Sequence, residues 1–192
     1  MILSDCDIRT EIEWGQLVVS PLPPFHALQP ASLELGLDFG EQAESVSARV
    51  EGDTLILPPN SFCLAHTVET VALSDRLGAQ VNGKSSLGRL GLLVHATAGY
   101  VDPGFRGQIT LELKNLHERD TIVLMRGQAI AQLVLHRMFR AAEKPYGSEG
   151  LGSHYQDQCG TTPSYLSKDP NHWSEWSAVT VDECTPPCIT VT

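Results

Sequence analysis

Residues 83–115 read GKSSLGRLGLLVHATAGYVDPGFRGQITLELKN, and the rest of the chain is organised around this stretch. It contains a Gly-Lys-Ser-Ser turn and an Asp-Pro-Gly turn. Its last eight residues, QITLELKN, alternate polar and apolar side chains, which predicts a strand with one buried and one open face. Polar groups at this density indicate a site for a polar, phosphorylated ligand.

The same short pattern continues on both sides of this stretch. Turn signals such as Glu-Gly-Asp at 51–53 and Pro-Pro-Asn at 58–60 separate the apolar runs, and no long helical pattern alternates with them. Many short strands at close spacing predict an all-β barrel or sandwich. The strands are expected at residues 32–37, 46–50, 54–57, 62–67, 69–73, 92–97, 108–115, 121–124 and 129–138.

The two ends of the chain carry different patterns. Residues 3–15 are expected to form a short helix, with Ser4 as N-cap and Asp7 completing a variant of the capping box. Four prolines predict an extended, irregular segment over residues 17–30.

After about residue 141 the chain becomes rich in Gly, Ser and Tyr, which predicts a mobile or docked arm over about 141–165. We expect one domain, residues 1–165, that includes this arm. Residues 166–192 form a tail of unknown role, in which Trp173 and Trp176 stand without a core-forming pattern.

Composition narrows the functional classes. The 192 residues carry a formal net charge of −10, which disfavours nonspecific binding to nucleic acid or to membrane surfaces. The start of the chain lacks the apolar run of a signal peptide, and no run reaches the length of a membrane span. Five scattered cysteines indicate a reduced, cytoplasmic protein. Cys184 and Cys188 have no second pair at ligand spacing, so the pattern does not predict zinc.

Residues 78–85, GAQVNGKS, match the phosphate-binding pattern G-x-x-x-x-G-K-[ST]. That pattern requires a strand, the loop and then a helix within a parallel α/β sheet. The preceding residues 74–76 are polar and turn-like, and the chain downstream is built from strands. A P-loop is therefore not expected. The zinc-deaminase signature H-x-E with P-C-x-x-C is also absent from the sequence.

The turn itself has two interpretations. Ser85 suits the N-cap of a single helical turn, and Arg89 lies four residues on, near the same face. Lys84, Ser85, Ser86 and Arg89 would then surround one point with a hydroxyl, cations and free N–H groups, which suits a phosphate. The same residues fit a capped turn with a solvated arginine.

Three further side chains are candidates on the same terms. Asp102 fits a turn that bonds its own backbone, or a carboxylate for a sugar hydroxyl or a water. Glu112 is the only carboxylate of the 108–115 strand, so it fits either a general base in a pocket or an exposed residue of an open sheet. His95 is expected to be a core histidine bonded to backbone.

These residues resemble a known family. The stretch from Gly83, together with MILSDCDIR, LQPASLELGL and HYQDQCGTTPS, looks very like the dCTP deaminases, which are relatives of the trimeric dUTPases. The resemblance covers roughly residues 1–165. It implies a mostly β, dUTPase-like distorted barrel with short helices that assembles as a homotrimer with sites at subunit boundaries. It also implies Mg²⁺ carried by the nucleotide triphosphate, with neither zinc nor a protein-held metal.

The resemblance assigns roles to individual residues. Glu112 matches the general base that activates water for attack on cytosine C4, and Ser85 and Arg89 match residues that assist the base and handle protons. Asp102 matches a residue at the deoxyribose. The remaining positions match nucleotide contacts. They are Lys84, Ser86, Leu87 and Gly88 of the phosphate loop, Thr110 and Leu111 at the base, and Gln132, Tyr146, His154 and Gln158 as the arm closes.

Two branches of this family differ in product. One releases dUTP and ammonia, whereas the other continues to dUMP and diphosphate in the same site. Ala98 and Gly99 resemble the dUMP-forming branch, because the other branch has a bulkier residue, often His, where Gly99 stands. We expect the dUMP-forming activity; the alternatives are a deaminase that stops at dUTP, a non-catalytic nucleotide-binding protein and a P-loop kinase.

Some positions depart from the family pattern. Glu34 replaces the usual Asp of an early strand, and Gly36 replaces a common Arg. His154 stands where a phosphate-binding Lys is usual, so triphosphate binding is expected to be weaker or more dependent on pH.

Overall fold

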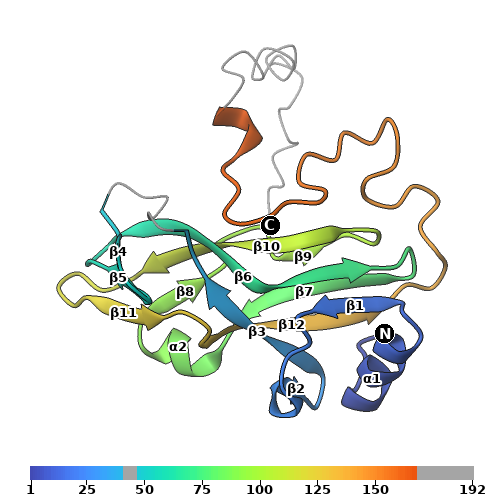
Figure 1. The fold of residues 1–192 in the computed structure, drawn as a ribbon, viewed down its shortest axis with the longest axis horizontal. Helices are drawn as coiled ribbons and strands as arrows, with labels where there is room; N and C mark the ends of the chain where they lie inside the picture. The colour runs from blue at the N-terminus through green and yellow to red at the C-terminus, as the bar shows by residue number, and fades with distance from the viewer. Residues whose placement is uncertain (41–46, 168–192) are drawn as a thin grey trace, which may run out of the picture. The chain divides into compact units, whose positions relative to one another are not determined.

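The computed structural model of this protein describes residues 1–40 and 47–167. Strands dominate these residues and the helices are short (Figure 1), so the mostly β fold class is confirmed. The helical segments are α1 (Asp5–Glu13), η1 (Phe25–Ala27), α2 (Ser85–Arg89) and η2 (Tyr165–Ser167). The strands are β1 (Leu17–Ser20), β2 (Leu28–Gln29), β3 (Ser32–Asp38), β4 (Arg49–Glu51), β5 (Thr54–Leu57), β6 (Phe62–Leu73), β7 (Leu77–Gly83), β8 (Leu92–Val94), β9 (Tyr100–Val101), β10 (Arg106–Asn115), β11 (Ile122–Met125) and β12 (Ala129–Arg137).

Nine of the described strands form one sheet in the order β8-β10-β6-β3-β12-β7-β9, with β1 beside β6 and β2 beside β3. A smaller sheet has the order β11-β5-β4. Although β8 and β7 are far apart in the first order, a Cβ atom at Gly83 of β7 would lie 3.2 Å from Cβ of Val94 in β8. The large sheet therefore curls until its two ends approach each other (Figure 1).

The alternation along β10 is confirmed. The side chains of Leu111 and Leu113 are fully buried. Thr110 and Glu112, which alternate with them, are half-buried on the other face. Strand β3 follows the same rule from Leu33 onward, with Leu33, Leu35 and Leu37 inside and Glu34 and Asp38 partly exposed. Period-two patterning of this kind sets which face of each strand joins the core, because successive side chains point to opposite faces.

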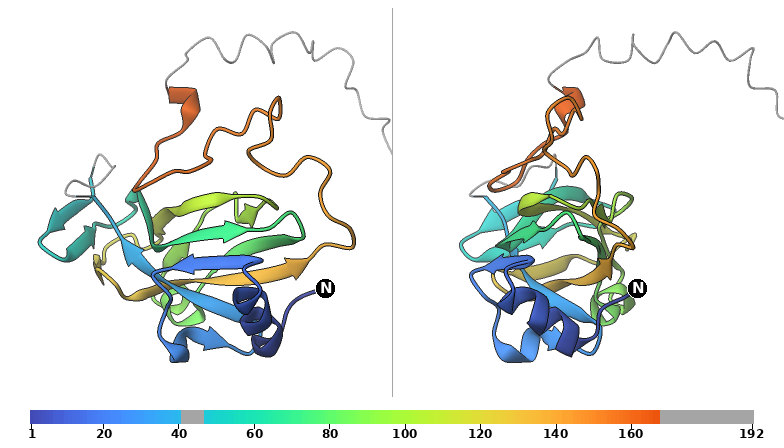
Figure 2. Two further views of the ribbon diagram at one scale, coloured as in Figure 1. Left: turned by 45° about the vertical axis from the view of Figure 1, so that its right-hand side comes forward. Right: turned by 90° about the vertical axis from the view of Figure 1, so that its right-hand side faces the viewer.

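Helix α1 begins as the sequence predicts. Ser4 is the N-cap, its Oγ accepts from the backbone N–H of Asp7 at 3.3 Å, and Oδ2 of Asp7 accepts from the N–H of Ser4 at 3.0 Å. The side-chain hydrogen bond from Ser4 lowers the pKa of Asp7. Gly15 has φ of 68°, the left-handed conformation expected after the helix end. The helix is shorter than residues 3–15, and it lies beside β1 (Figure 2).

Several expected strand boundaries were wrong. Residues 17–30 contain β1 and β2, because the prolines begin only after β1 has paired with β6. The separate strands expected at 62–67 and 69–73 are the single strand β6. Strand β7 was not among the expected strands.

Other boundaries shift by a few residues. Strand β8 ends at Val94 rather than at residue 97, because His95 has φ of 63° and leaves the extended conformation. The strand expected at 46–50 begins at Arg49 among the described residues.

The first compact unit spans Met1–Thr162, and the second spans Pro163–Thr192. Trp173, Trp176 and the Cys184–Cys188 pair lie outside the described residues. No helix in the described part of the chain is long and apolar enough to cross a membrane.

Glu69 offers a test of this packing. Its side chain is buried in β6, and its Oε2 accepts a hydrogen bond from the N–H of Gly36 at 2.9 Å. Burial raises the pKa of Glu69 above its ordinary value of 4.5. A raised folded-state pKa means that this group stabilises the fold below pH 4.5 and that the contribution is lost as pH rises through the folded value.

Glu69→Gln keeps an acceptor for Gly36 but carries no charge. We therefore expect the melting temperature of Glu69→Gln, relative to the parent, to rise by roughly 2–4 °C between about pH 4 and pH 7. Thermal melts across that range measure it. A difference that stays constant with pH would contradict the assignment.

Candidate functional site

The phosphate-type turn follows β7 directly and forms the one-turn helix α2. Lys84 is its N-cap, with φ of −75° and ψ of 136°, and the carbonyl of Lys84 accepts from the N–H groups of Leu87 and Gly88, both at 3.0 Å. The expectation that Ser85 is the N-cap was wrong, because Ser85 already belongs to the helix. A strand precedes this turn and a helix follows it, as in a P-loop. However, β7 pairs antiparallel with both β12 and β9, whereas a P-loop requires a parallel sheet.

Helix α2 presents a polar surface. The side chains of Ser85, Ser86 and Arg89 are exposed, and Leu87 is half-buried against the core. Gly88 has open space around the position of a Cβ atom. Two hydroxyls and a guanidinium therefore stand on one turn, where a phosphorylated ligand can reach them.

Lys84 is already neutralised within the chain. Its Nζ pairs with the carboxylate of Glu34, and the two side chains are only 21% and 15% exposed. Gln132 of β12 lies opposite Glu34 in the pairing with β3 and opposite Asn82 in the pairing with β7. The structure thus brings Lys84, Glu34 and Gln132 together. The sequence had marked Glu34 as a substitution but had not placed it against Lys84.

Glu112 lies on the open face of β10, and Thr97 holds it. The Oε2 atom of Glu112 accepts from the N–H of Thr97 at 3.2 Å and from its Oγ1 at 3.4 Å. The carbonyl of Glu112 accepts from the N–H of His95 at 2.9 Å. One carboxylate oxygen is thereby oriented by the 95–97 turn, and Oε1 is left for another partner. The sequence analysis had not predicted the contact between Thr97 and Glu112.

The two ends of the His95–Gly99 segment, His95 and Gly99, are partly buried, whereas Thr97 and Ala98 are exposed. The Nδ1 atom of His95 is buried without a hydrogen-bond partner in the described part of the chain, so the backbone bond expected for this histidine is not made by Nδ1. The carbonyl of Gly99 accepts from the N–H of Val81 at 2.7 Å. A Cβ atom at position 99 would lie 2.8 Å from the carbonyl oxygen of Val81, so a side chain there requires the backbone to shift.

Asp102 lies in the turn before β10 with its side chain exposed, and its carbonyl accepts from the N–H of Phe105 at 3.1 Å. Thr110 shares the open face of β10 with Glu112. The side chain of Leu111 points into the core, so only its backbone is available on that face.

The arm after β12 returns to β10 (Figure 2). The ring of Tyr146 lies 5.9 Å from that of Phe105, and its hydroxyl accepts from the N–H of Tyr155 at 3.0 Å. His154 is exposed. The Nε2 of Gln158 donates to the carbonyl of Gln108 at 2.6 Å. The structure therefore brings Tyr146 and Gln158 to the start of β10.

Comparison with known proteins places this geometry in a family. A family model described as dCTP deaminase-like matches residues 2–138. The chain belongs to the dCTP deaminase-like family. A curated protein of Salinispora tropica named "dCTP deaminase, dUMP-forming" is 41% identical over 194 residues, which cover 92% of this chain and 97% of that protein. A protein of the same name from Mycobacterium sp. is 44% identical over 182 residues, 85% of this chain and 95% of that protein.

Solved structures share the fold of this dCTP deaminase-like chain. The 2'-deoxycytidine 5'-triphosphate deaminase of Agrobacterium tumefaciens superposes with a TM-score of 0.57 at 24% identity, over 71% of this chain and 48% of that one. The dUTPase of Staphylococcus bacteriophage 80alpha gives a TM-score of 0.50 at 16% identity, over 68% and 95% of the two chains. The expected relation to the dUTPase fold is confirmed.

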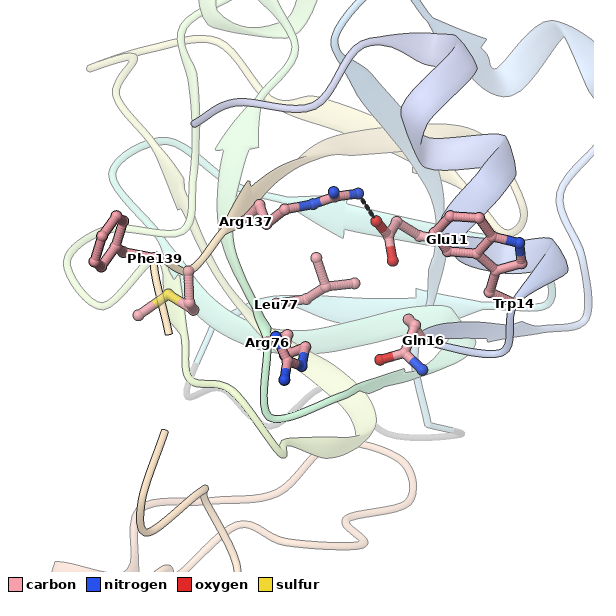
Figure 3. Close-up of a pocket in the computed structure, with 8 residues that line it drawn as sticks. Glu11, Trp14, Gln16, Arg76, Leu77, Arg137 and Phe139 are labelled. Carbon is pink, nitrogen blue, oxygen red and sulfur yellow. Dashed lines mark hydrogen bonds and ion pairs between the residues drawn. The ribbon is translucent and has the colours of Figure 1, made fainter. Parts of the chain in front are cut away.

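A cavity of about 530 Å³ lies elsewhere on this dCTP deaminase-like chain (Figure 3). Figure 3 shows Glu11 and Arg137 pointing toward each other, and the two form an ion pair. The cavity is also lined by Trp14, Gln16, Arg76, Leu77, Met138 and Phe139. None of the predicted site residues lines it, so it is distinct from the candidate site.

Proposed function

We propose that this chain is a dCTP deaminase that forms dUMP. The single observation that carries the proposal is the Glu112 carboxylate, held by Thr97 on the open face of β10. It stands in a chain whose relatives at 41–44% identity carry the name dCTP deaminase, dUMP-forming. A fixed carboxylate on an accessible face is the group that hydrolytic attack on a ring carbon requires.

In the first step Glu112 takes a proton from water, and the resulting hydroxide attacks C4 of cytosine. Ser85 and Arg89 assist proton transfer and stabilise the addition intermediate. Glu112 passes the proton it took from water to N3, and it then carries the hydroxyl proton of the adduct to the amino group. The C4–N bond breaks, ammonia leaves and C4=O forms, which gives dUTP. Because Thr97 occupies Oε2 of Glu112, Oε1 is the oxygen available to the water.

In the second step a water attacks the α-phosphorus, the bond to the bridging oxygen breaks, and diphosphate leaves to give dUMP. Asp102 stands at the deoxyribose and beside this water. Lys84, Ser86, Leu87 and Gly88 contact the phosphates, and Thr110 and Leu111 contact the base. Gln132 and the arm residues Tyr146, His154 and Gln158 complete the nucleotide site.

Mg²⁺ fits as a companion of the triphosphate. The described residues contain no group of three or more His, Cys, Asp or Glu side chains arranged to hold a metal ion. Lys84 is paired with Glu34, so the turn offers little net charge beyond Arg89 to a highly anionic substrate. Magnesium on the phosphate oxygens would supply that missing counter-charge.

A homotrimer is the proposed assembly. Leu90 and Leu116 are 61% and 58% exposed beside helix α2, and the N–H of Leu116 donates to the carbonyl of Gly91 at 2.9 Å. This apolar surface adjoins the candidate site, where a second copy of the chain would cover it. Light scattering measures the mass of the assembly.

Incubation with dCTP and Mg²⁺ tests the activity. We expect ammonia and diphosphate in equal amounts, dUMP as the nucleotide product and no build-up of dUTP. Ion-exchange chromatography identifies the nucleotides, and separate assays quantify ammonia and diphosphate. Accumulation of dUTP without diphosphate would show that the chain catalyses deamination alone. Nucleotide binding without turnover would contradict the assignment as an enzyme.

A further inference from the structure

The arm pairs with the first residues of β10 through its backbone. The N–H of Asp157 donates to the carbonyl of Arg106 at 2.7 Å, and the N–H of Gln108 donates to the carbonyl of Gln158 at 3.0 Å. Gly107 lies directly beside Gln158, and a Cβ atom at Gly107 would lie 3.0 Å from that residue. The close approach therefore depends on a glycine at position 107.

Beyond Gln158 the arm is held by side chains from the open face of the sheet. The amide of Gln108 is fixed on one side, where Nε2 donates to the carbonyls of Thr67 at 3.0 Å and Val68 at 3.2 Å. Its Oε1 is thereby aimed at the arm and accepts from the N–H of Gly160 at 2.6 Å. A side chain fixed at both ends makes a rigid anchor.

His66 supplies the next contact. Its Nδ1 lies 2.9 Å from Oγ1 of Thr161, and the residue is only 6% exposed. Thr110 lies opposite His66 on β10 and accepts from the N–H of Thr162 at 3.3 Å. The Nε2 of His66 lies 3.7 Å from Oδ2 of Asp38. His66 of β6 therefore contacts the arm directly through Nδ1.

The chemistry of the contact suits a neutral ring. Burial lowers the pKa of His66. A neutral imidazole has one donor and one acceptor nitrogen, and the hydroxyl of Thr161 can serve either.

We propose that His66 is a positioning residue, which holds the Gly160–Thr162 segment on the sheet and so keeps Gln158 in place for the nucleotide. The second half rests on the proposed function, in which Gln158 contacts the substrate. We call the His66–Thr161 contact the latch. When the arm is ordered before the nucleotide binds, less conformational entropy is lost on binding, so loss of the latch should change KM more than kcat. His66 itself touches neither the substrate nor the reacting atoms.

Isosteric substitutions test the latch from both sides. His66→Leu removes the ring nitrogen and keeps an apolar side chain in the buried space. Thr161→Val removes the hydroxyl from the arm with little change in shape. His66→Asn keeps a polar group close to the position of Nδ1 and serves as the rescue variant. The His66→Leu/Thr161→Val double variant completes the cycle.

The first readout is amide hydrogen exchange of residues 158–162 without nucleotide. Loss of one hydrogen bond, worth about 1 kcal/mol, corresponds to roughly fivefold faster exchange in each single variant. The double variant should exchange no faster than either single variant, and His66→Asn should restore protection. Equal exchange in the parent, His66→Leu and Thr161→Val would overturn the latch. Because Thr161 lies on the arm, its variant decides the matter even if His66→Leu does not fold.

The second readout is steady-state turnover of dCTP with Mg²⁺. We expect KM to rise roughly fivefold in both single variants while kcat changes less than about twofold. Faster exchange with an unchanged or lowered KM would overturn the positioning role. If the parent itself does not turn over dCTP, the proposed function fails, and the exchange data still decide whether His66 holds the arm.

Discussion

Glu112→Gln is expected to lower the rate of ammonia release from dCTP by about 10²–10⁴-fold. Glutamine has nearly the shape of glutamate, and its amide oxygen can still accept from Thr97, as Oε2 of Glu112 does at 3.2 Å. The side chain should therefore stay in place on β10. What it loses is the ability to take a proton from water, so kcat should fall much more than KM rises.

Glu118→Gln is the matched control, because Glu118 is an exposed glutamate on the loop after the same strand. It removes the same charge without touching the open face, and it should retain parent activity. Circular dichroism checks that both variants fold, and a dCTP-binding titration checks that Glu112→Gln still recognises the nucleotide. Ammonia release that survives in Glu112→Gln would remove Glu112 from the role of general base.

The sequence predicts well wherever a local pattern determines the structure. The alternation of residues 108–115 correctly gives the two faces of β10, and the Ser4–Asp7 capping box correctly gives the start of α1. Both depend on residues within a few positions of one another. The sequence pattern divided β6 because residues on either side of Val68 look like separate runs, whereas in the structure the strand continues through a register shift in its pairing with β10, between His66 and Thr70.

Strand β7 illustrates the opposite case. Its sequence, LGAQVNG, contains two glycines and overlaps the phosphate-loop pattern of residues 78–85, and no strand was expected there. In the structure Gly78 is a point of close approach, since a Cβ atom there would meet the hydroxyl of Tyr100 at 2.5 Å. A glycine required by a distant neighbour has the same local signature as a glycine required by a turn.

The candidate site divides in the same way. The chemistry-bearing residues Glu112 and Arg89 stand out because a carboxylate on a strand face and a cation on a turn are visible in the sequence. Their supports are separated from them along the chain. Thr97 is 15 residues from Glu112, and Glu34 is 50 residues from Lys84. No spacing rule connects such pairs, and only the sheet topology reveals them.

Gly99→His is expected to convert the enzyme from dUMP to dUTP production. The resemblance places a bulkier residue, often His, at this position in the branch that stops at dUTP, so a large side chain there is compatible with deamination. In this structure a Cβ atom at Gly99 would lie 2.8 Å from the carbonyl oxygen of Val81 and 3.6 Å from Cδ2 of His95. The segment must therefore move away from β7 to admit a side chain.

That movement affects the second hydrolysis more than the first. Glu112 is held by the Thr97 end of the segment, whereas Gly99 adjoins the Tyr100–Val101 strand that leads to Asp102. In Gly99→His we expect the rate of diphosphate release to fall at least about tenfold. The fold-decrease in the rate of ammonia release should be several times smaller, so dUTP accumulates. Gly99→Ala, which adds only the Cβ atom, should give a smaller shift in the same direction. The molar ratio of diphosphate to ammonia measures both. If that ratio stays at one in Gly99→His, the choice of product does not depend on the space at Gly99.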